Sequence, residues 1–195
     1  MLSKGQFTQV ADQARAFSRV GSEIERMESL IHDLLLLAEL GESKPVNFAE
    51  VDFDELVKAH LNDFQVLNKS RIVTTEIPDD CFVQGSREHL SRLIQNCLSN
   101  ILRHTPSDAP VSVSLRNIGK RAELKIEDGG PGLPESAYGS EIKFMNRFDP
   151  SRSRESGGSG LGLSIIAAIV QEHNGQLELS KSQLGGLAVT IRIPN

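Results

Sequence analysis

The sequence has few of the features that mark secreted, membrane-spanning or nucleic-acid-binding proteins. Its two cysteines, Cys81 and Cys97, match no CxxC or zinc-binding spacing, so we expect small buried residues in a reducing compartment. The longest aliphatic run, LLLLA at 34–38, falls far short of the roughly 18 residues of a membrane span, and no signal peptide precedes it. A formal net charge of −5 argues against a broad basic surface. These absences predict a cytoplasmic chain that binds neither membrane nor nucleic acid.

Residues 8–40 are expected to form one long helix. Apolar or small side chains recur there in steps of three and four, which is the spacing of a coiled-coil seam. The seam consists of Val10, Ala14, Phe17, Gly21, Ile24, Met27, Ile31, Leu34 and Ala38. One helix cannot bury its own seam, so the pattern predicts partner helices. The Gly and Pro of GESKP (41–45) end this segment.

The rest of the chain alternates between helical and extended patterns. Period-two alternation at 111–117 and 121–127 predicts one hairpin, and 175–180 with 187–193 predicts a second. Other elements are expected at 48–53 (strand), 54–64 (helix), 71–77 and 81–85 (strands around the turn PDD), 87–104 (helix with Ser86 as N-cap) and 161–173 (helix ended by Asn174 and Gly175). Helices combined with antiparallel strand pairs predict an α+β two-layer sandwich.

The segment RLIQNCLSNILRH (92–104) carries a row of polar side chains within a helix rich in Leu and Ile. Positions four apart lie on one face of a helix, so the pattern predicts a polar stripe: Arg92, Asn96, Asn100 and Arg103. The opposite face is apolar and is expected to pack into the core: Leu90, Leu93, Ile94, Cys97, Leu98 and Ile101. The stripe by itself fits a solvated face as well as it fits a binding site.

Two glycine-rich stretches indicate where an anion would bind. EDGGPGL (127–133) follows a predicted strand, and GGSGLGLS (157–164) opens a predicted helix, whose exposed N–H groups and dipole favour phosphate. Ordinary turns are an alternative explanation of such runs. There is no P-loop, because the only Gly-Lys pair, Gly119-Lys120, lacks the upstream glycine and precedes an arginine. The second stretch also lacks the third glycine and the preceding strand of a dinucleotide site.

The segment between the two glycine stretches is expected to be a functional lid over residues 134–158. A loop of this length without periodic patterning is uncommon in a compact domain unless it serves a function or is disordered. Arginines in it can meet phosphate oxygens, and phenylalanines can hold it to the body of the domain. These residues are Arg147, Arg152 and Arg154, with Phe144 and Phe148.

The order of four segments resembles that of sensor histidine kinases. QNCLSNILRH, EDGGPGL, FMNRF and GGSGLGLS correspond to the N box, first glycine box, F box and second glycine box of that family, whose ATPase superfamily also includes gyrase, MutL and the heat-shock chaperone ATPases. The resemblance covers about residues 45–195 and implies the Bergerat ATP-binding fold, a mixed sheet of about five strands with three helices. ERMESLIHDLLLLAEL further resembles the second helix of the dimerisation domain in these kinases.

The resemblance implies roles for individual residues. Asn96 would coordinate the Mg²⁺ that bridges the triphosphate, and an amide oxygen suits such a hard cation. Asp128 would accept the N6 hydrogen of adenine, while Gly130 and Gly132 let the backbone approach. The other implied ATP-binding residues are Asn100 near the sugar and phosphates, Arg103 at phosphate, His104 at the base, Arg147, Phe148, Arg152 and Arg154 of the lid, and Gly158, Ser159, Gly160, Leu161 and Gly162. Arg92 replaces the catalytic glutamate of the wider superfamily, which suits a kinase that does not activate water.

The chain has five histidines, and none lies in the HELRTP-like segment that carries the family's phosphoacceptor. His104 belongs to the N box, and the other four are expected to be surface or packing residues. LSKGQFT (2–8) resembles the turn between the two dimerisation helices. We therefore expect a partial dimerisation domain at 1–42 without its acceptor helix, an ATP-binding catalytic domain at 43–195, and no catalytic residue within this chain.

The implied reaction transfers the γ-phosphoryl group of ATP to a histidine, for relay to an aspartate of a response-regulator receiver domain. The parent protein would dimerise through the dimerisation helices and be anchored in the cell membrane. One alternative is an anti-sigma-factor serine kinase of the same fold, although such kinases lack the long N-terminal helix. A second is a non-catalytic nucleotide-binding module, which the intact Asn96, Asp128 and glycines argue against.

Overall fold

The computed structural model describes residues 30–40, 47–135, 138 and 161–195, together with scattered positions between 17 and 28. The chain divides into two compact units, Met1–Glu39 and Leu40–Asn195. Residues 30–40 form a continuous helix, and the described positions between 17 and 28 are helical as well. The predicted start of this helix at residue 8 lies outside the described residues. Within the described part of the chain, no helix combines the length and apolar composition needed to cross a bilayer.

The predicted seam of the N-terminal helix is exposed wherever its side chains are described. Phe17 is 76% exposed, and four further apolar members are each more than half exposed. These four are Ile24, Met27, Ile31 and Leu34. The first unit therefore presents an uncovered apolar stripe, as the sequence predicts for a helix that needs partners.

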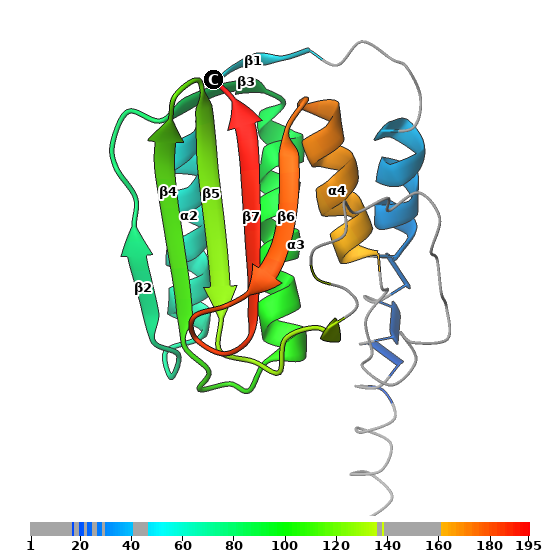
Figure 1. Ribbon diagram of the computed structural model, residues 1–195. Helices are drawn as coiled ribbons and strands as arrows, with labels where there is room; N and C mark the ends of the chain where they lie inside the picture. The colour runs from blue at the N-terminus through cyan, green and yellow to red at the C-terminus, as the bar shows by residue number, and fades with distance from the viewer. Residues whose placement is uncertain are drawn as a thin grey trace, which may run out of the picture. The chain divides into compact units, whose positions relative to one another are not determined.

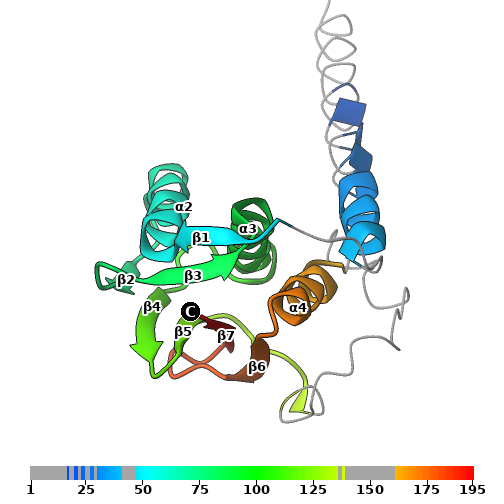
Figure 2. The same ribbon diagram turned by 90° about the horizontal axis from the view of Figure 1, so that it is seen from above.

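The second unit is an α+β sandwich, in which α2, α3 and α4 cover one face of a five-stranded sheet (Figures 1 and 2). Its elements are β1 (Ala49–Asp52), α2 (Phe53–Leu67), β2 (Val73–Glu76), β3 (Phe82–Gly85), α3 (Arg87–His104), β4 (Val111–Ile118), β5 (Arg121–Asp128), α4 (Gly162–Glu172), β6 (Gln176–Lys181) and β7 (Leu187–Pro194). The sheet order is β2-β4-β5-β7-β6, with β2 and β4 parallel and the other pairs antiparallel. The mixed sheet, the two predicted hairpins and the helices that cover it are confirmed.

The strands on either side of the turn 78–80 belong to different sheets. β2 pairs with β4, whereas β3 pairs with β1 in a separate two-stranded antiparallel sheet. β2 is a short edge strand without a fully buried side chain, and β3 buries Val83 and Gly85. Asp80 adopts a left-handed conformation with a φ of 65°, and the next amide, that of Cys81, donates to Asp54 Oδ1 at 2.8 Å. The turn thus redirects the chain away from a hairpin.

Helix α3 has the two faces that its sequence predicts. The six apolar side chains assigned to its inner face are all buried. Its start is also as expected, since Ser86 Oγ accepts a hydrogen bond from the His89 amide at 3.3 Å. Burial of the apolar face fixes the rotation of the helix, so the stripe that carries Asn96 and Asn100 is turned away from the core.

Strand β5 places a carboxylate among core residues. Its side chains alternate between partly exposed and buried, and the buried series is Ala122, Leu124, Ile126 and Asp128. Asp128 is therefore the last inward-facing residue of the strand, on the same face of the sheet as the helices. The pleat of the strand alone determines that this carboxylate, and not that of Glu127, faces inward.

Candidate functional site

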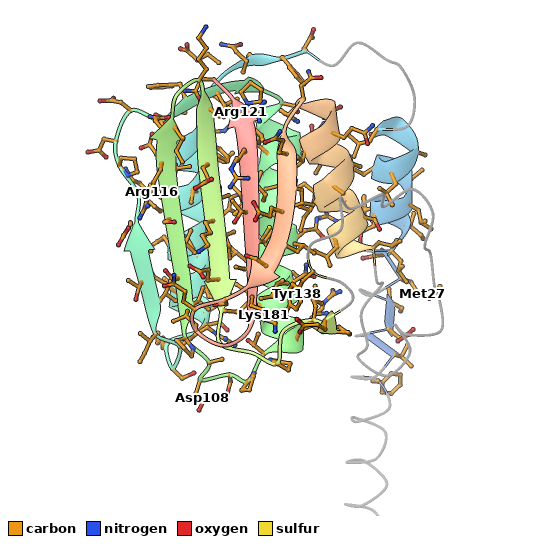
Figure 3. The ribbon with its side chains drawn as sticks, viewed as in Figure 1. Met27, Asp108, Arg116, Arg121, Tyr138 and Lys181 are labelled. Carbon is orange, nitrogen blue, oxygen red and sulfur yellow. The ribbon has the colours of Figure 1, made fainter. Side chains whose placement is uncertain are left out.

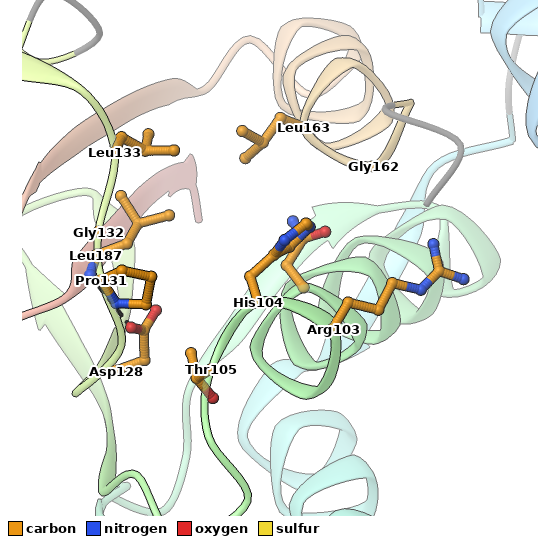
Figure 4. Close-up of a pocket in the computed structure, with 11 residues that line it drawn as sticks. Arg103, His104, Thr105, Asp128, Pro131, Gly132, Leu133, Gly162, Leu163 and Leu187 are labelled. Atoms are coloured by element: carbon orange, nitrogen blue, oxygen red, sulfur yellow. Dashed lines mark hydrogen bonds between the residues drawn. The ribbon is translucent and has the colours of Figure 1, made fainter. Parts of the chain in front are cut away.

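A pocket of about 240 Å³ lies where α3 ends and α4 begins (Figure 4). Segments far apart in the sequence meet there: the end of α3, the loop after β5, the start of β7 and the first turn of α4. The lining residues are Asn100, Arg103, His104, Thr105, Asp128, Pro131, Gly132, Leu133, Gly162, Leu163 and Leu187. Asp128 and His104 come from opposite walls of the pocket. Six of the residues predicted from sequence thus line one pocket, namely Asn100, Arg103, His104, Asp128, Gly132 and Gly162.

The Asp128 carboxylate is held by backbone groups on one of its two oxygens. Oδ1 accepts the amide of Gly130 at 2.8 Å and that of Leu187 at 3.3 Å. The side chain is buried, with 8% of its surface exposed. No hydrogen bond from the described residues reaches Oδ2. The arrangement orients the carboxylate and keeps one oxygen as an acceptor for a ligand in the pocket.

The amide oxygens of Asn96 and Asn100 approach the start of α4. A Cβ atom built on Gly162 would lie 2.9 Å from Asn100 Oδ1 and 3.4 Å from Asn96 Oδ1. The Nδ2 group of Asn96 donates to the carbonyl of Arg92 at 2.9 Å, so the oxygen is the atom that faces α4. Glycine at 162 is needed for this close approach.

Residues 85–195 match the family model described as histidine kinase-, DNA gyrase B- and HSP90-like ATPase. The chain belongs to this family. It is 34% identical over 182 residues to the probable sensor histidine kinase TcrY of Mycobacterium tuberculosis, covering 93% of this chain and 38% of that protein. It is 30% identical over 199 residues to the signal transduction histidine-protein kinase BaeS of Escherichia coli, covering 98% of this chain and 43% of that protein.

A solved structure gives the same result. The mycobacterial sensor histidine kinase MprB matches with a TM-score of 0.62 and 28% identity, over 76% of this chain and 97% of that one. The chain thus contains the ATP-binding catalytic domain of a sensor histidine kinase. It spans less than half the length of the relatives TcrY and BaeS.

Several residues that line the pocket of this kinase domain were not among the site residues predicted from its sequence. Thr105, Pro131, Leu133, Leu163 and Leu187 line the pocket beside the predicted residues. Pro131, Leu133 and Leu163 lie within the two glycine-rich stretches, and Thr105 directly follows QNCLSNILRH, so these motifs were the available signal for the four residues. Leu187 follows the Gly-Gly pair of the last hairpin. It is an apolar strand residue, and nothing in the sequence distinguishes such a residue from one that only packs in the core.

Gly186 is a further residue that sequence reasoning missed. Its amide donates to the carbonyl of Asp128 at 3.0 Å. A side chain at this position would collide with Asp128 Oδ1 and would lie only 2.5 Å from the amide nitrogen of Gly130. The turn between β6 and β7 must therefore be glycine here, because it packs directly on the carboxylate. The sequence feature that could have pointed to Gly186 is the Gly-Gly pair in this hairpin turn.

Other predicted residues of the kinase domain lie elsewhere or outside the described residues. Gly130 holds Asp128 and does not line the pocket as described, and Leu161 is buried with 4% of its surface exposed. The lid predicted at 134–158 lies outside the described residues except for Pro134, Glu135 and Tyr138. The same holds for seven residues assigned to it and to the second glycine stretch: Arg147, Phe148, Arg152, Arg154, Gly158, Ser159 and Gly160.

The described residues contain no group of three or more His, Cys, Asp and Glu side chains arranged to hold a metal ion. Mg²⁺ commonly takes one or two ligands from the protein and the rest from substrate phosphates and water. The Asn96 amide oxygen, turned toward the start of α4, fits such a ligand.

Three of the remaining histidines serve packing. His60 Nε2 lies 2.8 Å from Ser91 Oγ, and His89 Nδ1 lies 2.7 Å from Glu172 Oε2. His173 is buried and stacks on Phe48 with ring centroids 4.7 Å apart. These contacts confirm the packing interpretation for the three.

His173 also fixes the ends of two helices. Its Nε2 accepts the Ser86 amide at 3.1 Å, so Nδ1 carries the proton and donates to the Ile169 carbonyl at 2.8 Å. Burial lowers the pKa of His173, which keeps this ring neutral. The ring and the His89–Glu172 pair join the start of α3 to the end of α4. The other end of α4 then meets Asn100 at the pocket.

Proposed function

We propose that this chain donates the phosphoryl group in a two-component sensor kinase. It binds ATP with Mg²⁺ and transfers the γ-phosphoryl group to a histidine, from which an aspartate of a response-regulator receiver domain takes it. The main support is the Asp128 carboxylate, which two backbone amides hold at the wall of a pocket that Asn100 and His104 also line. The relatives TcrY and BaeS carry the names of sensor histidine kinases, which supports the same reaction class.

The base of ATP is assigned to the Asp128 end of the pocket. Asp128 Oδ2 accepts the exocyclic N6 hydrogen of adenine, because no described residue donates to this oxygen. Leu133 and Leu187 supply apolar surface for the ring, and His104 flanks it from α3. Gly132 has a φ of 69° and packs against Tyr138, so a side chain there would be strained and would narrow the pocket.

The phosphates are assigned to the start of α4. The N-cap residue Leu161 has no polar side chain to bond the first amides of this helix, and the dipole favours an anion there. Asn96 holds Mg²⁺, Asn100 lies near the sugar and phosphates, and Arg103 meets a phosphate. Lid and glycine residues complete the phosphate site: Arg147, Phe148, Arg152, Arg154, Gly158, Ser159, Gly160 and Leu161. Mg²⁺, when bound, neutralises negative charge on the triphosphate.

The catalytic contribution of these residues is positioning and charge stabilisation. No histidine of the chain lies in an acceptor motif, so the acceptor belongs to a different dimerisation helix. The exposed apolar stripe of residues 17–34 supports self-association of the parent protein through such helices. We place residues 1–42 in a partial dimerisation domain and 43–195 in the catalytic domain. The parent protein is proposed to be anchored in the cell membrane.

The test is incubation with γ-labelled ATP, first of this chain alone and then with an intact acceptor-helix domain of a related sensor kinase. We expect acid-labile label on the added domain and none on this chain. An Asp128→Asn variant, matched in size, should label the added domain much more slowly. Acid-labile label on this chain alone would overturn the assignment of the acceptor.

The same assay separates the alternatives. Acid-stable label on a serine would favour the serine kinase of the same fold. ATP binding without any transfer, even to several acceptor domains, would favour a non-catalytic nucleotide-binding module.

A further inference from the structure

The wall of the pocket at Thr105 is anchored by an arginine that lies outside every motif of the sequence. Arg71 precedes β2 and is buried, with 7% of its surface exposed. Its NH1 group donates to Thr105 Oγ1 at 2.8 Å and to the carbonyl of Ala109 at 3.0 Å. One side chain therefore holds both ends of the loop that connects α3 to β4.

Arg71 is a poor choice for stability alone. Among the described residues, no carboxylate pairs with it, and its buried Nε–H has no hydrogen-bond partner. A buried charge without an opposite charge and a buried donor without an acceptor both oppose folding. The two hydrogen bonds from NH1 are its evident contribution, and both fix the loop 105–109.

Arg71 determines which part of Thr105 faces the pocket. The Thr105 hydroxyl accepts from Arg71 and donates to the Ile101 carbonyl at 2.7 Å, so its position is fixed from two sides. The methyl group is left to face Gly130, where a Cβ atom would lie 2.6 Å from Thr105 Cγ2. A β-branched side chain held at χ1 in this way presents a rigid apolar surface.

The same loop continues to the residues that hold Asp128. The Gly129 amide donates to the Pro110 carbonyl at 2.9 Å, and the Pro110 ring packs on Gly129. The Gly130 amide, next along the chain, donates to Asp128 Oδ1. A continuous series of contacts thus runs from Arg71 through the loop to the carboxylate.

We propose that Arg71 is a positioning residue for the nucleotide site. It holds the Thr105 methyl group against Gly130 and so sets the shape of the Asp128 end of the pocket. This inference rests on the proposed assignment of adenine to that end. It predicts an effect on base binding that is independent of Mg²⁺, since the metal is assigned to Asn96 at the other end.

The test is calorimetric binding of ADP, with and without Mg²⁺, to the whole chain. Arg71→Met removes both hydrogen bonds and keeps the length of the side chain, and we expect roughly five- to tenfold weaker binding in both conditions. Thr105→Val keeps the branched shape without the hydroxyl and should weaken binding similarly. The double variant should bind no worse than the weaker single variant, because both changes break one interaction. Arg71→Lys, which keeps a charged donor, should restore part of the affinity.

The matched control is Arg116→Met. Arg116 lies on β4, where its side chain is exposed and pairs with Glu76 on the neighbouring strand β2 at 2.9 Å (Figure 3). This variant should bind ADP as the wild type does. A lower melting temperature of Arg71→Met with unchanged ADP affinity would overturn the inference and leave a structural role only. If Arg71→Met does not fold, unchanged affinity of Thr105→Val overturns it equally. Failure of the wild type to bind ADP would instead refute the proposed function.

Discussion

Helices α3 and α4 begin in opposite ways. The start of α3 is closed by its own surroundings: Ser86 Oγ accepts the His89 amide, and the Ser86 amide itself donates to the buried His173. The start of α4 has Leu161 at the cap position and Gly162 as its first residue, with no side-chain cap from the part of the chain that the structure describes. The side-chain amide oxygens of Asn96 and Asn100, from another helix, lie close to its first residue, Gly162.

The difference separates a structural helix end from a functional one. A helix leaves its first four amides without partners inside the helix, and they must find partners elsewhere. Side chains supply such hydrogen-bond partners at the start of α3. They do so at α2 as well, where Asp52 accepts a hydrogen bond from the Glu55 amide at 2.9 Å. At α4 the cap position holds the apolar Leu161, and no side chain of the described residues caps this end, which suits an anionic ligand there.

The largest effect should come from closing the open helix end. Gly162→Val would place a branched side chain in front of Asn96 and Asn100, where even a Cβ atom comes within 2.9 Å of an oxygen. We expect ATP affinity to fall roughly a hundredfold, or by about 2.7 kcal/mol. Titration calorimetry measures it, with a thermal melt to confirm that the variant folds. An affinity equal to that of wild type would remove the phosphate site from this end of α4.

A second variant separates the metal from the rest of the site. Asn96→Ala removes the amide oxygen that faces α4, so ATP binding in the presence of Mg²⁺ should weaken by about tenfold or more. Binding measured in EDTA should change much less. Equal losses in the two conditions would mean that Asn96 shapes the helix and does not hold the metal.

The opposite end of the pocket predicts a choice of base. Asp128 Oδ2 accepts from the amino group of adenine but meets a carbonyl oxygen in guanine, and an unpaired buried acceptor costs about 1 to 3 kcal/mol. ATP should therefore bind roughly tenfold more tightly than GTP or better. Competition of both nucleotides against one fluorescent analogue measures this ratio. A ratio near one would refute the role of Asp128.

The contacts of His173 at the start of α3 should make the free energy of unfolding depend on pH. Burial depresses the pKa of His173, whereas the same ring in the unfolded chain titrates near its ordinary value of 6.5. The unfolded state therefore binds a proton that the folded state lacks, and the free energy of unfolding should fall as the pH drops below 6.5. The expected slope is at most about 1.4 kcal/mol per pH unit for this group.

Burial also lowers the pKa of the partly buried His60, which affects the same pH range, so the comparison needs a variant. His173→Gln keeps a donor and an acceptor without titrating. Urea melts of this variant at pH 5.5 and 6.5 should differ less than those of the wild type. Parallel curves for the two proteins would assign the acid sensitivity to other groups.

The smallest effect is expected at the cap itself. Ser86→Ala removes the oxygen that accepts the His89 amide and should lower the free energy of unfolding by about 1 kcal/mol. ATP affinity should not change, because Ser86 lies at the end of α3 away from the pocket. Chemical denaturation and calorimetry on the same sample give both quantities. A clear loss of ATP affinity would contradict the separation of the two kinds of helix end.

The parts of the fold that can be predicted from the sequence are those determined by residues close together in the chain. The hairpins and the inner face of α3 follow from side-chain alternation within one segment, and they are confirmed. The partners of β2 and β3 do not follow, because strands of four residues with few buried side chains do not specify which strand they join.

The site divides in the same way. Asn100, His104 and Asp128 stand in recognisable motifs, and the fold brings them to one pocket. Arg71 and Gly186 carry no such mark, since each acts on a residue distant in the sequence. Contacts of that kind exist only once the chain is packed, so periodicity and motif spacing cannot reveal them.

The hairpin of β4 and β5 links a distant turn to the choice of carboxylate in the pocket. Gly119 and Lys120 form its two-residue turn, with Gly119 at a φ of 64°, and the ladder then runs from Ile118–Arg121 to Val111–Asp128. Turn length sets strand register, and a shift of one residue exchanges the two faces of a strand. One residue inserted at 119 would therefore offer Glu127 to the nucleotide in place of Asp128. The ratio of ATP to GTP affinity, measured in solution, would then depend on the register between β4 and β5.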